Sequence, residues 1–186
     1  ATALSILTEP FFFKGSLNYI VWVRERFPES KILMKDFVID EYQILKAKAF
    51  GADAVLLIVA LLGENMTRQF LEKANSLGLS SLVEVHDKEE MSIALDCGAR
   101  LIGVNNRNLK DMTISLKTSE RLAGMANKDT ILISESGLKS RNDLLYLKSF
   151  GYKGFLIGTS FMKSGNPGKA LAKILDSEEN MDINVF

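Results

Sequence analysis

Seven short apolar runs recur along the chain, and polar clusters follow most of them. The runs are rich in Ile, Leu and Val and show little polar alternation, as expected for parallel strands that are covered on both faces. Their spacing leaves room for a helix between successive runs. We predict strands over 3–7, 32–34, 54–59, 81–85, 101–104, 130–134 and 154–157.

The segments between the runs carry the signals of helix ends. Asp40 followed by Gln43, and Asp87 followed by Glu90, have the spacing of an N-cap residue with a reciprocal partner three positions later. Glycine suits the position after a helix because the chain commonly turns left-handed there. Four glycines precede the next predicted strand in this way: Gly51, Gly78, Gly98 and Gly151.

A regular alternation of strands and helices predicts either an open doubly wound sheet or a closed barrel. The open sheet usually carries a Gly-rich phosphate loop after its first strand, and neither G-x-G-x-x-G nor a Walker sequence is present. A (β/α)8 TIM barrel instead distributes its chemistry over many strand ends. We predict one barrel domain over 1–186 with seven βα units, which lacks the first strand, and a frayed tail over 177–186.

The composition fits one ordinary soluble domain, with 47% hydrophobic and 25% charged residues among 186. Lys+Arg and Asp+Glu number 23 each, so no overall field favours nucleic acid or a membrane surface as a partner. No apolar run approaches the roughly 20 residues of a membrane span. Cys97, the single cysteine, is expected to be a small buried residue and indicates a reducing compartment, with the cytoplasm as the default.

Five polar clusters stand at the ends of predicted strands. If the strands are parallel neighbours, these clusters lie on one face of the sheet and surround a single mouth. They bring a lysine, two carboxylates, an amide, an arginine and two glycine–hydroxyl pairs, which is the equipment of an enzyme. No metal-ligand spacing appears, so no metal or cofactor is expected. The clusters span 34–37, 83–86, 104–107, 134–137 and 157–160.

Seven stretches in order resemble the indole-3-glycerol phosphate synthase family, and the match runs from about residue 3 to residue 175. The resemblance implies a (β/α)8 barrel entered at its second strand. The family's first strand, with its Glu-x-Lys pair and phosphate loop, is not among these residues, so poor activity is expected of this chain alone. The stretches are LTEPFFFKGS (7–16), ILMKDF (32–37), ADAVLLI (52–58), LVEVH (82–86), GARLIGVNNR (98–107), SESG (134–137) and FLIG (155–158).

The resemblance implies ring closure of 1-(2-carboxyphenylamino)-1-deoxyribulose 5-phosphate, with loss of carbon dioxide and water, in tryptophan biosynthesis. Lys35 is the expected general acid, because a lysine at the end of an apolar strand is partly desolvated. Glu84 is the expected base of the dehydration, and Glu135 is expected to orient substrate and Lys35. The alternatives are an edge lysine paired with Asp36 and two salt-bridging carboxylates.

Further residues are expected to bind the substrate. Arg107 suits a carboxylate because its guanidinium binds in a bidentate manner, and Asn105 precedes it by two positions. Asn106 would point the other way in an extended segment. Phe37 is also expected to bind substrate. Leu56 is a plausible wall of the substrate pocket, although most aliphatic side chains on such strands simply fill the barrel. Phosphate is expected at the two glycine–hydroxyl pairs, Ser136 with Gly137 and Gly158 with Thr159.

Two further features of the sequence have simpler interpretations. Three consecutive phenylalanines, 11–13, suggest a mobile aromatic loop over the anthranilate ring of the substrate. They cannot all face one core, so at least one is expected to face solvent or ligand. His86 is interpreted as a surface or capping residue.

Two other functions stay open. The chain could be a non-catalytic barrel piece that pairs with a partner or self-associates, because the strands starting at residues 3 and 154 would be exposed edges. It could also be another phosphate-binding barrel enzyme, such as a sugar-phosphate isomerase or lyase, which the set of Lys35, Glu84, Asn105 and Glu135 disfavours.

Overall fold

The computed structural model describes residues 1–175, 184 and 185. The strands are β1 (Leu4–Leu7), β2 (Ile32–Lys35), β3 (Ala54–Ile58), β4 (Ser80–Val85), β5 (Leu101–Asn105), β6 (Ile131–Glu135), β7 (Gly154–Leu156) and β8 (Asn184–Val185). The helices are α1 (Asn18–Arg26), α2 (Glu41–Phe50), α3 (Val59–Ser76), α4 (Lys88–Asp96), α5 (Lys117–Ala123), α6 (Arg141–Ser149), α7 (Thr159–Met162) and α8 (Pro167–Leu175). Strands and helices alternate from β1 to α7, as the sequence predicts, and a further helix, α8, follows α7.

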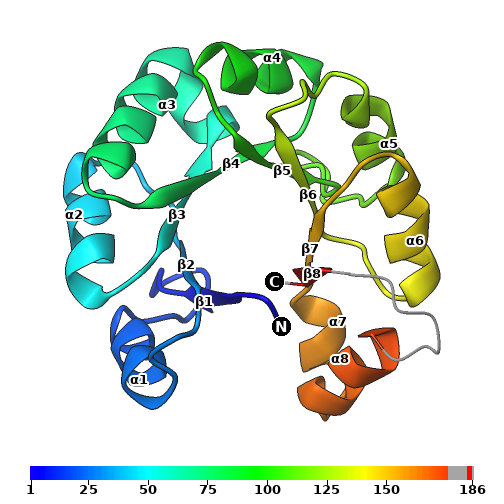
Figure 1. Cartoon of the computed structure of the whole chain (residues 1–186), viewed down its shortest axis with the longest axis horizontal. Helices are drawn as coiled ribbons and strands as arrows, with labels where there is room; N and C mark the ends of the chain where they lie inside the picture. Colours follow the sequence, from blue (N-terminus) through cyan, green and yellow to red (C-terminus); the bar gives the residue numbers. More distant parts are fainter. Residues whose placement is uncertain (176–183, 186) are drawn as a thin grey trace.

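The strands form one parallel sheet in the order β1 to β8. The sheet curls into an open barrel, with helices around its outside and a gap beside β1 (Figure 1). In the described residues, β2 is the one hydrogen-bonded neighbour of β1. The predicted (β/α) barrel is therefore confirmed as a curled, unclosed sheet.

The sequence prediction was wrong at the far edge of the sheet. Gly154 pairs with Asn184 and Phe155 with Val185, so β7 is covered by β8 and is not an edge. The predicted frayed tail over 177–186 thus includes a short strand, while 176–183 and 186 lie outside the described residues. No periodic apolar run announces β8, because two residues are too few to show a period.

Two apolar layers hold the strands in place. Outward-facing strand side chains pack beneath the helices in one cluster, which holds Met34 of β2 and Ile44 of α2 at 1% and 0% exposure. Inward-facing side chains fill the barrel in a separate cluster. Alternate residues of a strand point to opposite faces, so a continuous apolar run supplies both layers. The inner cluster consists of Leu33, Leu56, Ile58, Leu82 and Ile133.

The helix signals are largely confirmed. Asp40 and Gln43 form the reciprocal capping box that opens α2. Asp87 caps α4 by accepting from the backbone of Glu90, but the Glu90 carboxylate accepts from the backbone N–H of His86 instead of returning to Asp87. The four exit glycines all have positive φ, between 67° and 97°.

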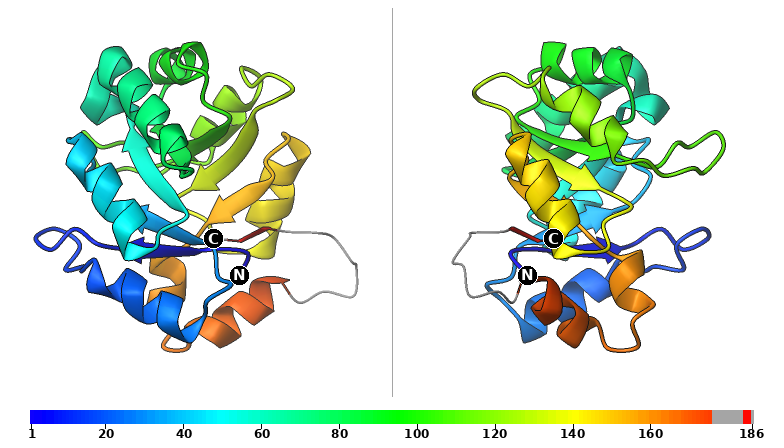
Figure 2. Two further views of the ribbon diagram at one scale, coloured as in Figure 1. Left: turned by 60° about the vertical axis from the view of Figure 1, so that its left-hand side comes forward. Right: turned by 90° about the vertical axis from the view of Figure 1, so that its right-hand side faces the viewer.

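The parallel arrangement collects all carboxyl strand ends on one side of the sheet. The β1–α1 and β5–α5 loops project together from that side (Figure 2). None of the helices in the described part of the chain has the length and apolar character that a membrane crossing needs.

Candidate active site

Three predicted residues meet inside the mouth of the barrel. The Lys35 Nζ lies 3.8 Å from Glu84 Oε2 and 3.9 Å from Glu135 Oε2. The lysine side chain is 20% exposed, and the two carboxylates are 4% and 2% exposed. Asp36 is not the partner of Lys35, because its carboxylate accepts from Thr8 Oγ1 and from the backbone of Phe37. The predicted lysine–carboxylate cluster is therefore present.

The two carboxylates have opposite electrostatic surroundings. Burial disfavours the charged form of Glu84, but the cationic partners His86 and Lys35 outweigh it and hold the pKa of Glu84 below its ordinary value. Burial and the charge of Glu84 raise the pKa of Glu135 to about 8, although Lys35 opposes them. At neutral pH the site therefore holds one ionised and one protonated carboxyl group, the division that acid and base duties require.

The β5 end extends the same site. Asn105 Nδ2 donates to Glu84 Oε1 at 3.1 Å, and its Oδ1 accepts from the Arg107 backbone at 3.0 Å. Asn106 points the other way, as predicted, and is 2% exposed. Its amide bonds to Ser134 and Ser119 behind the sheet. Asn105 therefore faces the mouth, and Asn106 anchors the strand end from outside it.

Arg107 occupies the entrance to the β5–α5 loop. Its backbone bridges to Ile114 in an antiparallel contact, so the loop forms a small hairpin. The guanidinium Nη1 lies 3.5 Å from the carbonyl oxygen of Met112 in that hairpin. Arg107 therefore lies at the rim of the mouth, two residues beyond the end of β5, and contacts the hairpin.

The structure places His86 differently from the sequence interpretation. Its side chain is 11% exposed, so His86 is not a surface residue. Nε2 lies 3.2 Å from Glu84 Oε1, and Nδ1 lies 3.0 Å from Glu90 Oε2. The periodicity of a strand could have predicted the contact with Glu84, because residues 84 and 86 are two apart and share a face.

The predicted phosphate pairs follow the neighbouring strands β6 and β7, which pair in register. Ser136 and Gly137 both have positive φ, at 66° and 83°. A Cβ added to Gly137 would stand 2.5 Å from Ile114 Cγ2, so the β5–α5 hairpin closes tightly over this turn. Gly158 and Thr159 are exposed at the start of α7.

The other two predicted substrate-binding residues, Leu56 and Phe37, lie at different depths in the barrel. Leu56 is 1% exposed inside the barrel and pairs in register with Leu82, so it fills the floor. Phe37 is partly buried at the top of the same cluster and stacks on Phe13 at 5.0 Å between centroids. Phe11 is 78% exposed, which confirms that the three phenylalanines do not share one core.

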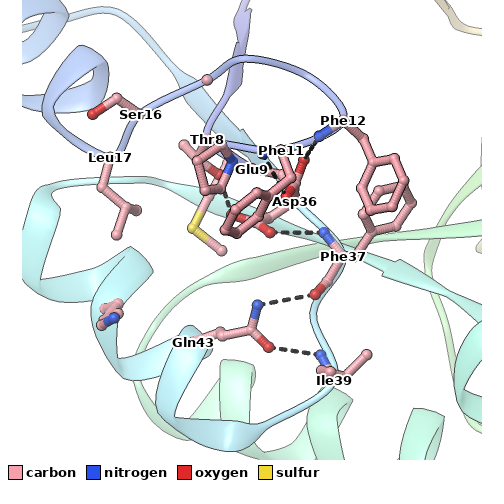
Figure 3. A pocket seen from close by; sticks show the side chains of 14 residues that line it. Thr8, Glu9, Phe11, Phe12, Ser16, Leu17, Asp36, Phe37, Ile39 and Gln43 are labelled. Atoms are coloured by element: carbon pink, nitrogen blue, oxygen red, sulfur yellow. Dashed lines mark hydrogen bonds between the residues drawn. The ribbon is translucent and has the colours of Figure 1, made fainter.

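A pocket lies beside this site, between the β1–α1 loop and the start of α2 (Figure 3). Its volume is about 570 Å³, and Asp36, Phe37 and Gln43 contribute to its wall. Neither Lys35 nor the two carboxylates line it. The pocket is thus separate from the lysine–carboxylate cluster.

Cys97 is partly exposed and lies 3.6 Å from the carbonyl oxygen of Glu64. The expectation of a buried cysteine is therefore wrong, although Cys97 packs against the core from its edge. Within the described residues, no group of three or more His, Cys, Asp or Glu side chains is arranged to hold a metal ion.

Comparison with known proteins identifies the architecture. The family model described as indole-3-glycerol phosphate synthase matches residues 1–174. An indole-3-glycerol phosphate synthase of Campylobacter jejuni subsp. jejuni serotype O:23/36 is 47% identical over 175 residues, which are 94% of this chain and 67% of the relative. That of Caldanaerobacter subterraneus subsp. tengcongensis is 52% identical over 161 residues, 87% of this chain and 62% of the relative.

A third relative, the indole-3-glycerol phosphate synthase of Acetivibrio thermocellus, is 47% identical over 162 residues, which are 87% of this chain and 62% of its own. The chain thus spans about two thirds of the length of these curated relatives. The match of the family model covers nearly the whole barrel, from β1 to the last turn of α8. The chain belongs to the indole-3-glycerol phosphate synthase family.

Proposed function

We propose that the mouth of this barrel performs the family reaction, a carboxy-lyase step of tryptophan biosynthesis. The substrate would be 1-(2-carboxyphenylamino)-1-deoxyribulose 5-phosphate and the product indole-3-glycerol phosphate. One observation carries the proposal: a lysine stands within 4 Å of two buried carboxyl groups whose pKa values are pushed in opposite directions.

Each group has a role that suits its surroundings. In ring closure, the ring carbon that bears the carboxylate bonds to the ketone carbon, and Lys35 donates a proton to the ketone oxygen. Loss of carbon dioxide from that ring carbon restores the benzene ring. In dehydration, Lys35, reprotonated from solvent, donates a proton to the new hydroxyl, which leaves as water, and the ionised Glu84 removes a proton from the carbon beside nitrogen. Glu135, whose raised pKa favours the protonated form, would orient the substrate by a hydrogen bond, and its position 3.9 Å from Nζ would help to orient the lysine.

The rim residues complete the proposed substrate site. Asn105 is held against Glu84 and presents its amide to the mouth. Arg107 would bind the benzoate carboxylate after turning from Met112, because the 3.5 Å contact that it leaves is weak. Phosphate would bind at the two turns after β6 and β7, where backbone N–H groups and the hydroxyls of Ser136 and Thr159 are available. Phe37 would contact the aromatic ring.

The test is turnover by the purified chain, followed by the fluorescence of the indole product. Low activity is expected, so protein is used in excess over substrate. Lys35→Met should reduce the rate about 100-fold or more, the usual contribution of a general acid. Lys128→Met is the matched control, because Lys128 is exposed in the loop before β6, at the opposite end of the strands. No turnover, or equal turnover by Lys35→Met, would contradict the proposal.

We also propose that the chain self-associates through β1. In the described residues β1 has a hydrogen-bonded neighbour on one side alone, and an open strand edge recruits other strands. Sedimentation that shows a dimer or larger species at micromolar concentration supports this proposal. A monomer at all concentrations contradicts it.

A further inference from the structure

His86 is the only histidine of the chain, and it stands at the junction between β4 and α4. One carboxylate oxygen, Glu90 Oε2, accepts from both its backbone N–H at 2.8 Å and its ring Nδ1 at 3.0 Å. The Glu90 side chain is 17% exposed, and its backbone is fixed by the Asp87 cap. The ring is therefore held at its base by a double contact with the first turn of α4.

The other ring nitrogen faces the catalytic cluster. Nε2 lies 3.2 Å from Glu84 Oε1, in contact but without the alignment of a hydrogen bond, and is buried. Asn105 donates to the same Oε1 oxygen, while Lys35 approaches the other oxygen, Oε2. A neutral imidazole carries one N–H and one lone pair, so one of its nitrogens would face a carboxylate with a lone pair. A ring between two carboxylates is stable as the cation.

We propose that His86 is a positioning residue: a fixed imidazolium, held by Glu90, that keeps Glu84 ionised and oriented as the base of the reaction proposed above. This inference rests on the proposed function. His86 acts through Glu84, because its ring is occupied by the two carboxylates. Glu90 is part of the same arrangement, because without it the imidazole ring would have a carboxylate partner on one side alone.

The charges around the ring are consistent with this role. Burial opposes the charged form of His86, yet the carboxylates of Glu84 and Glu90 outweigh it and raise the pKa of His86 to about 9. Lys35 at the end of β2 and Glu135 at the end of β6 also face Glu84 across the mouth, the former as a cation and the latter as a protonated acid. His86, Glu90, Lys35 and Glu135 together thus leave Glu84 as the ionised carboxylate of the cluster.

The lone histidine makes the first test direct. Labelling histidine with nitrogen-15 gives the two ring-nitrogen signals of one imidazole, so their titration needs no assignment to a residue. The midpoint in the unaltered chain should lie well above 6.5, and Glu90→Gln should lower it by roughly one pH unit or more. Glu89→Gln, an exposed neighbour on α4, is the matched control and should leave the midpoint unchanged. A midpoint near 6.5, or one that Glu90→Gln does not move, would overturn the proposal.

The second test follows Glu84 itself. With carbon-13 in glutamate carboxyls, the signal that Glu84→Gln removes identifies Glu84. In His86→Asn its pKa should rise by roughly one unit or more, and Glu90→Gln should move it in the same direction with the ring retained. If Glu84 titrates identically in both variants and the unaltered chain, His86 is a structural cap and the proposal fails. Glu90→Gln decides the matter if His86→Asn does not fold.

Kinetics separate this inference from the proposed function. In single-turnover measurements, both variants should shift the acidic limb of the pH profile to higher pH, with little change in the apparent substrate affinity. An unshifted limb counts against the positioning role. Absence of turnover in the unaltered chain defeats the proposed function, while the two titrations still decide whether His86 controls the charge of Glu84.

Discussion

The carboxylate of Glu135 fills the space that a side chain at Gly103 would need. A Cβ built on Gly103 would collide with Glu135 Oε1 and would stand 3.3 Å from Leu82 Cδ1. Gly103 lies on β5, in register with Glu84 on β4 and Ile133 on β6. The glycine therefore lets two carboxyl groups from flanking strands share one buried mouth.

Gly103→Ala should destabilise the protein and displace Glu135. Crowding a packed interior costs typically about 1–3 kcal/mol, and here the displaced group is a buried acid. Gly124→Ala is the matched control, because no atom lies within 4 Å of its added Cβ and its backbone is helical. Urea unfolding of the three proteins measures the effect. Equal stability of Gly103→Ala and the unaltered chain would contradict this account.

The sequence predicts the architecture of the site better than its supporting contacts. Lys35, Glu84 and Glu135 could be placed together because each ends an apolar run, and parallel strands end on one face. Gly103 gave no such signal, since it lies within an apolar strand and its role depends on a side chain from β6. The hydrogen bond from Asn105 to Glu84 depends likewise on how two strand ends meet, which spacing along one strand cannot show.

Asn106 shows the same limit on the outer side of the strands. Its orientation followed from strand alternation, but its partners come from 13 to 30 residues away. The amide donates to Ser134 Oγ and to the backbone oxygens of Glu135 and Ser136. Its oxygen accepts from Ser119. A single side chain thus connects β5, α5 and the turn after β6, beside the proposed phosphate site.

Asn106→Ala should destabilise the protein by about 3 kcal/mol, because several buried groups would lose their partners at a cost of about 1–3 kcal/mol each. Asn75→Ala is the control, since Asn75 is exposed on α3 and alanine favours a helix. Thermal and urea unfolding give the free energies. If Asn106→Ala lowers the free energy of unfolding by no more than Asn75→Ala does, water replaces the Asn106 amide.

Glu135 should make stability fall as pH rises. Its folded pKa, about 8, lies above the value of about 4.5 for a free glutamate, so the folded state holds a proton that the unfolded state releases between these values. Its stabilising contribution is complete below pH 4.5 and is lost as pH rises through 8, at up to about 1.4 kcal/mol per pH unit. His86 adds a loss of the same sign above 6.5.

The interval from pH 5.5 to 6.5 therefore isolates Glu135. Urea midpoints of the unaltered chain should fall across that interval, whereas those of Glu135→Gln should stay nearly level because the amide does not titrate. Above pH 6.5 both proteins should decline through His86. A slope in Glu135→Gln equal to that of the unaltered chain at pH 5.5–6.5 would assign the proton to another group.

Glu9 organises the aromatic loop between β1 and α1. Its carboxylate, which lies beside Phe11 and Phe12 in Figure 3, accepts from the backbone N–H groups of Phe11, Phe12 and Phe13. In the loop turned in this way, the ring of Phe13 stacks on Phe37. Burial opposes the charge, but these three donors outweigh it and lower the pKa of Glu9. The loop is thus ordered by a negative charge, which three backbone dipoles share.

Glu9→Gln should loosen this loop while the barrel stays folded, because an amide offers one neutral oxygen where the carboxylate offers two charged ones. Chymotrypsin, which cuts after exposed phenylalanines, should cleave the variant faster within 11–13. Glu25→Gln, exposed on α1, is the control and should be cleaved at the unaltered rate.

In the unaltered chain, the lowered pKa of Glu9 means that loop order is complete above about pH 4.5 and is lost as pH falls below it. Acid should therefore accelerate cleavage of the unaltered chain but not of Glu9→Gln, once the activity of the protease at each pH is corrected with an unstructured peptide. Equal acid sensitivity in both proteins would mean that the turn is held by Pro10 and the aromatic contacts instead of by the charge.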